Sequence, residues 1–339
     1  MKASQWFWLI FRRLVFMIPI LFGVVTLTFI LTRLAGGDPA YLIAGPFATE
    51  DVVANLRAQL GTDQPIASQY WSYLGDLVRG DLGTSLYSNR PVLSELWDRT
   101  PATLELVFIA IFFAFIIGNV SGSLAARNRD GRIDKVFRYS SFSALSLPDF
   151  WLGLVLIYLI FFRLGIAPPP MGQIAPGRSK PELITGAAVL DSLITFNWAA
   201  IKSSLNQIWL PLLTMIPIFS APISRLSRSS SIQALNSDWY TFGKACGLPQ
   251  KTLNRYALRA SLPPVITFTG ILFSVLLGSA VLVETVFSWG GVAQYAVSSI
   301  KVNDFPAIQG FIVMSGVFSV ICFLVVDIAY ALIDPRVRL

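Results

Sequence analysis

The sequence predicts an all-α membrane protein that crosses the bilayer with six transmembrane helices. Of its 339 residues, 54% are hydrophobic and 13% are charged, whereas soluble domains carry about 25% charged residues. Long apolar runs recur along the chain, and each can cross a hydrocarbon core of about 30 Å as a helix. Lysine and arginine residues cluster just beyond the ends of these runs, which is the pattern of the positive-inside rule.

The net charge of +7 raises nucleic-acid binding as an alternative. The basic residues flank apolar runs, however, and form no stripe with interleaved aromatic residues. We therefore expect a lipid bilayer, and no nucleic acid, as a partner. The sequence has no histidine, which excludes histidine-dependent catalytic and metal sites within it. It also lacks the Gly-x-x-x-x-Gly-Lys-Ser/Thr phosphate loop, so we expect no catalytic site, cofactor or metal in this chain.

The first predicted span is the apolar run from Leu14 to Thr32, which follows Arg12 and Arg13. A cleaved signal peptide is the alternative, but its apolar region would have about 7 to 15 residues and end in a small-x-small site. The run here is longer. We therefore expect a retained N-terminal transmembrane helix over residues 1–35, with the N-terminus inside the cell.

An outer segment is predicted for residues 36–101, where the composition turns polar. Short helices are expected within it from Asp51 to Leu60 and from Ile66 to Val78. Residues 102–333 are predicted to hold five further spans, of which Thr103 to Ala126 is the first. The basic residues that follow this span place its end inside the cell.

The third span is predicted from Phe142 to Phe162 and is interrupted by Pro148 and Asp149. A carboxylate at this depth is rare, which makes Asp149 a functional candidate. In the structural alternative, Asp149 lies on the buried face of a proline-kinked helix and bonds a freed backbone group or a neighbouring hydroxyl.

Residues 164–206 are predicted to form a second outer loop, with an amphipathic helix on the membrane surface from Ile184 to Ser204. The fourth span, Gln207 to Ser224, contains three prolines, which neighbouring helices in a bundle can tolerate. The fifth span, Val265 to Phe287, has Glu284 close to its outer end.

Two interpretations of Glu284 stay open. It is an interfacial carboxylate that reaches water, or it lines a translocation path together with Asp149 and favours cationic or zwitterionic solutes. The sixth span is predicted from Ala307 to Leu332, and the tail at residues 334–339 is expected to lie inside the cell.

Residues 229–264, between the fourth and fifth spans, are predicted to form a helical hairpin. Its lysine and arginine residues mark it as cytoplasmic; they include Lys244, Lys251, Arg255 and Arg259. A helical hairpin held at the inner membrane face is suited to bind a soluble partner.

The turn chemistry of the hairpin is specific. Ser237 or Asp238 can cap a first short helix, and Gly247 suits the left-handed residue that ends it. Pro249 can occupy the first turn of a second helix that ends near Pro263. We therefore expect a short helix, a tight turn and a basic helix.

Several stretches carry a resemblance to a known family. In order they are Leu60-Gly-Thr-Asp-Gln-Pro, Gly80-Asp-Leu-Gly-Thr-Ser, Thr100-Pro-Ala-Thr-Leu-Glu-Leu, Ser146-Leu-Pro-Asp-Phe-Trp-Leu-Gly, Gly186 to Asn197, Val283-Glu-Thr-Val-Phe-Ser-Trp and Asp334-Pro-Arg-Val-Arg. Over nearly its whole length the chain resembles the permease subunits of ABC importers in the dipeptide, oligopeptide and nickel class. The resemblance implies a type I ABC importer transmembrane-domain fold.

The hairpin resembles the coupling loop of that family, which docks into a groove on a cytoplasmic ATPase. Ala245, Gly247 and Leu248 match its central pattern. The coupling site that we assign by this resemblance also contains Asp238, Trp239, Tyr240 and Gly243. The Glu-Ala-Ala triplet of the family is replaced by Thr241-Phe242-Gly243.

The resemblance also implies a set of partners in the bacterial inner membrane. These are a second homologous permease, two cytoplasmic ATPase subunits that hold ATP and Mg, and a periplasmic substrate-binding protein. Both outer segments would then be periplasmic and both termini cytoplasmic. We expect six helices to be too few to enclose a wide pathway alone, which fits a second permease.

The expected cargo is a small peptide or peptide-like solute, with nickel chelates, opines and short sugars as alternatives of the same class. Nickel favours nitrogen and sulfur donors, and neither Cys246 nor Cys322 lies in an outer segment. A stand-alone secondary transporter would need its own coupling-ion site, for which Asp149 is the candidate. A membrane enzyme would need convergent catalytic groups, whereas the carboxylates here are scattered through loops.

Overall fold

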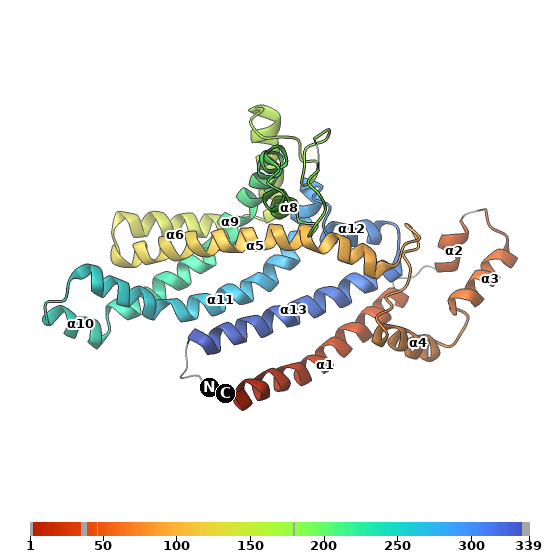
Figure 1. The fold of residues 1–339 in the computed structure, drawn as a ribbon, viewed down its shortest axis with the longest axis horizontal. Coiled ribbons are helices and arrows are strands. Elements are labelled where there is room, and N and C mark those ends of the chain that lie inside the picture. Colours follow the sequence, from red (N-terminus) through yellow and green to blue (C-terminus); the bar gives the residue numbers. More distant parts are fainter. Residues whose placement is uncertain (1–2, 35–38, 46, 179, 334–339) are drawn as a thin grey trace. The chain divides into compact units, whose positions relative to one another are not determined.

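The computed structural model describes residues 3–34, 39–45, 47–178 and 180–333. Their secondary structure is helical, apart from one isolated antiparallel bridge between Thr84 and Pro91. The elements in Figure 1 are α1 (Ala3–Leu34), α2 (Pro39–Ala44), α3 (Glu50–Leu60), α4 (Ile66–Val78), α5 (Val92–Arg127), α6 (Arg132–Leu145), α7 (Asp149–Leu156), the π-helix η1 (Ile157–Arg163), α8 (Ala188–Ile194), α9 (Trp198–Leu235), α10 (Asp238–Ala245), α11 (Gln250–Phe287), α12 (Val292–Lys301) and α13 (Phe305–Ile333). The predicted tail at residues 334–339 lies outside the described residues.

Five of these helices are long and apolar enough to cross a membrane. The qualifying segments are Val15–Leu34, Val92–Arg127, Trp198–Leu235, Gln250–Phe287 and Phe305–Val325. A sixth span results if α6 and the α7–η1 segment, which are bent by 97° at a short break, count as one. The predicted all-α membrane fold is therefore confirmed.

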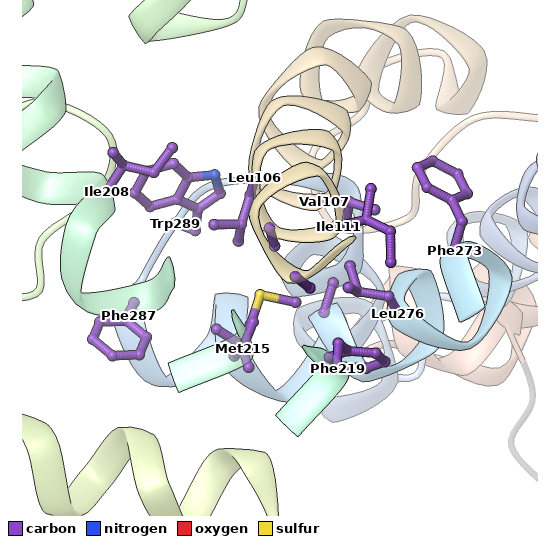
Figure 2. Close-up of a cluster of buried hydrophobic side chains, with 14 of the residues drawn as sticks. Leu106, Val107, Ile111, Ile208, Met215, Phe219, Phe273, Leu276, Phe287 and Trp289 are labelled. Carbon is purple, nitrogen blue, oxygen red and sulfur yellow. The ribbon is translucent and has the colours of Figure 1, made fainter. Parts of the chain in front are cut away.

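Ala102–Trp289 and the described residues after Val320 form the first of two compact units. Its core is a cluster of buried apolar side chains drawn mainly from α5, α9 and α11 (Figure 2). Leu106, Met215 and Leu276 are fully buried in it, and Trp289 is 2% exposed. Burial of such large side chains contributes roughly 1.5–3 kcal/mol each. This core fixes the helices on both sides of the hairpin.

The second unit contains the described residues up to Pro101 together with Gly290–Val320. Its small core is formed by the start of α5, by α12 and by α13, with the buried residues Val92, Leu96, Tyr295 and Ala307. Asp304 accepts the hydroxyl of Ser85 at 2.5 Å and the backbone N–H of Leu86 at 3.2 Å. This carboxylate therefore holds the loop that precedes α5.

The two short helices expected in residues 36–101 are present as α3 and α4. Gly61 ends α3 in a left-handed conformation with φ +64°. A glycine suits this position because it has no Cβ to oppose a positive φ.

The third predicted span is not one kinked helix. The α6 helix ends at Leu145, Pro148 adopts an extended backbone, and α7 begins at Asp149. Proline has no N–H to donate and disfavours a helical conformation in the residue before it. The helix therefore breaks at Pro148 instead of bending there.

The prediction of one amphipathic helix from Ile184 to Ser204 was wrong. The chain instead forms the short helix α8, turns through Phe196 with φ +50°, and starts α9 at Trp198. Asn197 accounts for this start, because its side chain accepts the N–H of Ala200 at 3.1 Å and so caps the new helix.

The fourth and fifth spans are longer than the sequence predicted. The α9 helix has 38 residues and continues through Pro211, Pro217 and Pro222. The α11 helix also has 38 residues and passes through Pro263 and Pro264, so the second hairpin helix does not end there. Packing in the core of the first unit overrides the low helix propensity of proline.

Candidate functional site

The α10 helix forms the tip of a hairpin between the end of α9 and the beginning of α11 (Figure 1). Ser237 takes the N-cap position, as predicted, and its carbonyl accepts the N–H of Thr241 at 3.1 Å. The predicted side-chain cap is absent, because the Ser237 hydroxyl donates to the carbonyl of Ala234 at 2.6 Å. Asp238 is the first helical residue, where a carboxylate is stabilised by the helix dipole.

Gly247 ends α10 in the left-handed conformation that the sequence predicts, with φ +73°. The N–H of Gly247 donates to the carbonyl of Lys244, and the N–H of Leu248 donates to that of Gly243, each at 3.1 Å. This pair of bonds is a Schellman motif, which satisfies carbonyls that the helix end would leave open. The turn is therefore fixed by backbone bonds that depend on Gly247.

Gly243 is the third residue of the replaced triplet and is buried against the turn. A Cβ atom there would lie 2.8 Å from Leu253 Cδ2 and 3.2 Å from Leu248 Cδ1. Leu253 on α11 is only 1% exposed. Glycine at this position thus lets α10 approach α11 closely.

A small polar network joins α10 to the first turn of α11. The side-chain amide of Gln250 donates to the Tyr240 hydroxyl at 2.7 Å and to Asn254 Oδ1 at 3.0 Å. The Tyr240 hydroxyl donates to Asn254 Oδ1 at 3.3 Å. Pro249 immediately precedes this turn as the N-cap of α11, not as a residue of the first turn as predicted. The hairpin is therefore braced by both polar and apolar contacts.

Large apolar side chains of α10 and of the turn after it are exposed on the surface of the hairpin. Phe242 is 71% exposed, Leu248 44% and Trp239 42%. Asp238 and Ala245 are also exposed. We call the set Trp239, Phe242, Ala245 and Leu248 the apolar face of the hairpin. Such a face in a basic loop is suited to contact with another protein.

Family models match almost the whole chain. The family described as binding-protein-dependent transport system inner membrane component matches residues 118–339. The N-terminal family of the same transport-system membrane components matches residues 6–107. The chain belongs to this family of transport-system membrane components. It is therefore a permease subunit with the type I ABC importer membrane fold.

Curated relatives of this permease match over nearly their full length. A probable D,D-dipeptide transport system permease protein, DdpB, of Escherichia coli (strain K12) is 40% identical over 333 residues, 98% of each chain. The dipeptide transport system permease protein DppB of Alkalihalophilus pseudofirmus is 36% identical over 332 residues, 96% of this chain and 98% of the relative. The glutathione transport system permease protein GsiC of Escherichia coli (strain K12) is 33% identical over 330 residues, 97% of this chain and 98% of the relative.

Asp149 of the permease is half-buried at the first position of α7. One carboxylate oxygen accepts the hydroxyl of Ser279 on α11, and the other accepts the N–H of Phe150 at 2.7 Å. A bond to a neighbouring hydroxyl is the arrangement that the structural alternative anticipated. Asp149 therefore ties the break between α6 and α7 to α11.

Glu284 is fully buried, so the interpretation that it reaches water was wrong. It accepts the hydroxyl of Thr103 on α5 at 2.5 Å. Asp149 and Glu284 thus have different hydroxyl partners on different helices.

Among the described residues, no group of three or more Cys, Asp or Glu side chains could hold a metal ion.

A groove with a volume of about 540 Å³ lies in the first unit between α5, α6 and α9. Its wall is mostly apolar, with serine hydroxyls along it; the lining includes Phe113, Ser121, Ser140, Trp209, Pro217 and Ser224. Neither Asp149 nor Glu284 belongs to this lining. The two carboxylates that sequence reasoning singled out are therefore separate from the groove.

Sequence reasoning missed the close contact between α5 and α9. A Cβ atom on Gly118 would lie 2.7 Å from the Ser220 carbonyl oxygen, and one on Gly122 would lie 2.4 Å from that of Ser224. A hydrogen bond of 2.9 Å from the Ser121 hydroxyl to the Ser224 hydroxyl also joins the two helices. The spacing Gly118-Asn-Val-Ser-Gly122 is the small-x-x-x-small pattern of packed transmembrane helices, so this signal was available in the sequence.

Buried carboxylates also organise the loop before α9. Asp191 is 1% exposed and accepts the N–H groups of Thr185 and Gly186 at 2.8 and 3.0 Å. Burial alone would raise the pKa of Asp191, but its hydrogen bonds outweigh that effect and hold the pKa below its usual range. Glu105 on α5 accepts the N–H of Leu190 at 2.8 Å. These contacts anchor α8 to α5.

Proposed function

We propose that this permease is one of two membrane subunits of an ATP-driven importer, and that a cytoplasmic ATPase binds its α10 hairpin. The observation that carries the proposal is the exposed apolar face on a hairpin whose turn is fixed by a Schellman motif. An apolar face of defined shape suits a protein groove better than lipid headgroups or nucleic acid.

The proposed topology places the hairpin, both termini and the basic loop between α5 and α6 in the cytoplasm of a bacterial cell. The lysine and arginine residues near these elements support this placement in the inner membrane. Residues 36–101 and 164–206 would then be periplasmic, where a substrate-binding protein delivers the cargo.

The mechanical step follows from the continuity of two helices. Since α9 leads into α10 and α11 leads out of it, with short turns between, a displacement of α10 moves both long helices. ATP and Mg held by two ATPase subunits would supply that displacement when the ATPases close on each other. A second homologous permease would complete the path, and alternating access would be a rigid-body motion of one half against the other.

The proposed cargo is a small peptide or peptide-like solute. The relatives named above are permeases for dipeptides, D,D-dipeptides and glutathione, all of which carry both ammonium and carboxylate groups. The half-buried Asp149 is retained as a candidate for the path, because its charge suits such zwitterions better than anions. Nickel chelates, opines and short sugars are the competing cargoes.

The experiment that tests this proposal measures uptake of labelled di- and tripeptides against labelled nickel in cells that lack other importers. The tagged permease should co-purify with a second permease and an ATPase encoded beside it. Peptide uptake that requires ATP and all of these subunits is the expected result. Nickel uptake without peptide uptake would overturn the cargo, and uptake without any ATPase would overturn the mechanism.

A further inference from the structure

An ion pair between a buried carboxylate on α6 and a partly exposed arginine on α9 joins these two helices close to α10. Asp134 is 1% exposed, and both of its carboxylate oxygens accept hydrogen bonds of 2.6 Å from Arg228, one from Nε and one from Nη2. The N–H of Asp130 donates to Asp134 Oδ2 at 3.0 Å. A bidentate arginine–carboxylate pair with an additional backbone donor is geometrically specific and resists sliding.

The pair lies where α9 is also held by α5. A Cβ atom on Gly122 would come within 2.9 Å of the backbone nitrogen of Arg228. The backbone of α9 at Arg228 therefore touches α5, and the Arg228 side chain reaches α6. From Arg228 the helix continues to Leu235, and α10 begins at Asp238. Arg228 thus lies about two helical turns before the end of α9.

The other end of α6 leads to the break at Pro148 and to Asp149, which accepts the hydroxyl of Ser279 on α11. The segment from α6 to α7 is therefore bonded to α9 at its first turn and to α11 just after its break. These are the two helices that flank α10. Beyond the break, a Cβ atom on Gly153 of α7 would lie 3.2 Å from Phe287 and 3.5 Å from Thr214, so α7 also packs on both.

We propose that Asp134 and Arg228 are positioning residues for transport, because their ion pair makes the bent α6–α7 segment follow α9 when the hairpin is displaced. The proposal rests on the function proposed above. Without the pair, α9 could move while α6 and the Asp149 end of α7 lag behind. Hydrolysis of ATP would then continue with less cargo moved for each ATP.

The functional test uses the complete importer in proteoliposomes and measures peptide uptake per ATP hydrolysed. Asp134→Asn keeps the shape of the side chain but removes its charge. Arg228→Lys keeps the positive charge but removes the planar guanidinium that donates two hydrogen bonds to Asp134. We expect both variants to assemble and to lower uptake per ATP about tenfold. Asp130→Asn is the matched control, because its exposed carboxylate lies 3.6 Å from Arg129 in the loop just before α6, and the substitution leaves the backbone N–H that Asp134 accepts unchanged.

A distance measurement distinguishes the positioning role from a purely structural one, because a purely structural role predicts no ATP-dependent change in the distance between α6 and α9. Spin labels would be placed on Gln233→Cys near the end of α9 and on Val136→Cys in α6, which are both exposed positions, with Cys246 and Cys322 replaced by alanine. In the otherwise native importer, the label–label distance should stay constant when ATP is added. In Asp134→Asn it should change or broaden with ATP.

Three results would overturn the inference. Unchanged uptake per ATP in both variants would remove the positioning role, and so would an unchanged distance in Asp134→Asn. Loss of membrane-inserted protein in both variants would assign the pair to stability alone. The Leu248→Asp variant in the hairpin separates this inference from the proposed function. Normal transport by Leu248→Asp would overturn the hairpin proposal. Loss of uptake in Leu248→Asp together with normal uptake per ATP in Asp134→Asn would contradict only the role of the ion pair.

Discussion

Thr103 on α5 donates its hydroxyl to the carboxylate of Glu284 on α11 at 2.5 Å, and Glu284 has no exposed surface. Five residues further along, the indole N–H of Trp289 donates to the carbonyl of Ala102 at 3.0 Å. Two neighbouring residues on α5 therefore bind Glu284 in the last turn of α11 and Trp289 just after that helix. The sequence stretches that begin at Thr100 and Val283, which carry part of the family resemblance, meet in these two bonds.

Glu284→Ala should destabilise the permease, because the buried hydroxyl of Thr103 loses this acceptor. Removing a buried hydrogen-bond partner costs roughly 1–3 kcal/mol. Glu284→Gln keeps an acceptor oxygen and should retain most of the stability. Thermal unfolding in detergent measures the difference, with the exposed Glu182→Ala as control. Equal unfolding temperatures for Glu284→Ala and the native protein would contradict the assigned role.

Gly122→Ala should separate α5 from α9, since its Cβ would meet the Ser224 carbonyl oxygen at 2.4 Å and Ser227 Cβ at 2.8 Å. Forcing an extra methyl group into such a contact costs roughly 1–3 kcal/mol. Gly278→Ala is the matched control, because it is also a helical glycine but has no atom within 4 Å of the added Cβ. The fraction of folded protein after heating distinguishes them. Similar losses for both glycines would rule out a specific contact.

Gly247→Val should impair uptake, whereas Gly247→Asn should be milder. No atom lies within 4 Å of a Cβ at Gly247, so the effect comes from the positive φ and not from a clash. An L-residue in this region costs roughly 1–2 kcal/mol, and asparagine tolerates it best. Peptide uptake and ATP hydrolysis by the assembled importer report the effect. Native behaviour of Gly247→Val would mean that the turn need not keep its Schellman geometry.

Asp191 predicts a pH-dependent stability. Its pKa is lower in the folded protein than in the unfolded chain, so its contribution is present above the unfolded pKa of about 3.9. That contribution is lost as the pH falls through the folded pKa. Asp191→Asn should therefore lower the unfolding temperature at pH 7 and approach the native value below about pH 4. The exposed Asp63→Asn is the control; a deficit that persists unchanged at low pH would contradict the assignment.

The sequence predicted the spans and the hairpin because long apolar runs, flanking lysines and the turn chemistry of Gly247 are local signals. It located the interruption at Pro148 but not the 97° bend, since a proline kinks or breaks a helix according to the helices around it. The burial of Glu284 was missed because position along a helix does not reveal which face is covered. The partners Asp134 and Arg228 lie 94 residues apart, and only folding brings them together. Gly118 and Gly122, by contrast, could have been found from their spacing.

The central claim, that an ATPase binds the α10 hairpin, is tested most directly by a photoreactive amino acid in place of Phe242, the most exposed large side chain of the apolar face. The probe would be activated in membranes that contain the complete importer. We predict a crosslink from position 242 to the ATPase subunit and none from a control probe at Phe196, which is 78% exposed in the segment assigned to the periplasm. Absence of the crosslink at position 242, while the ATPase still co-purifies with the permease, would contradict the claim.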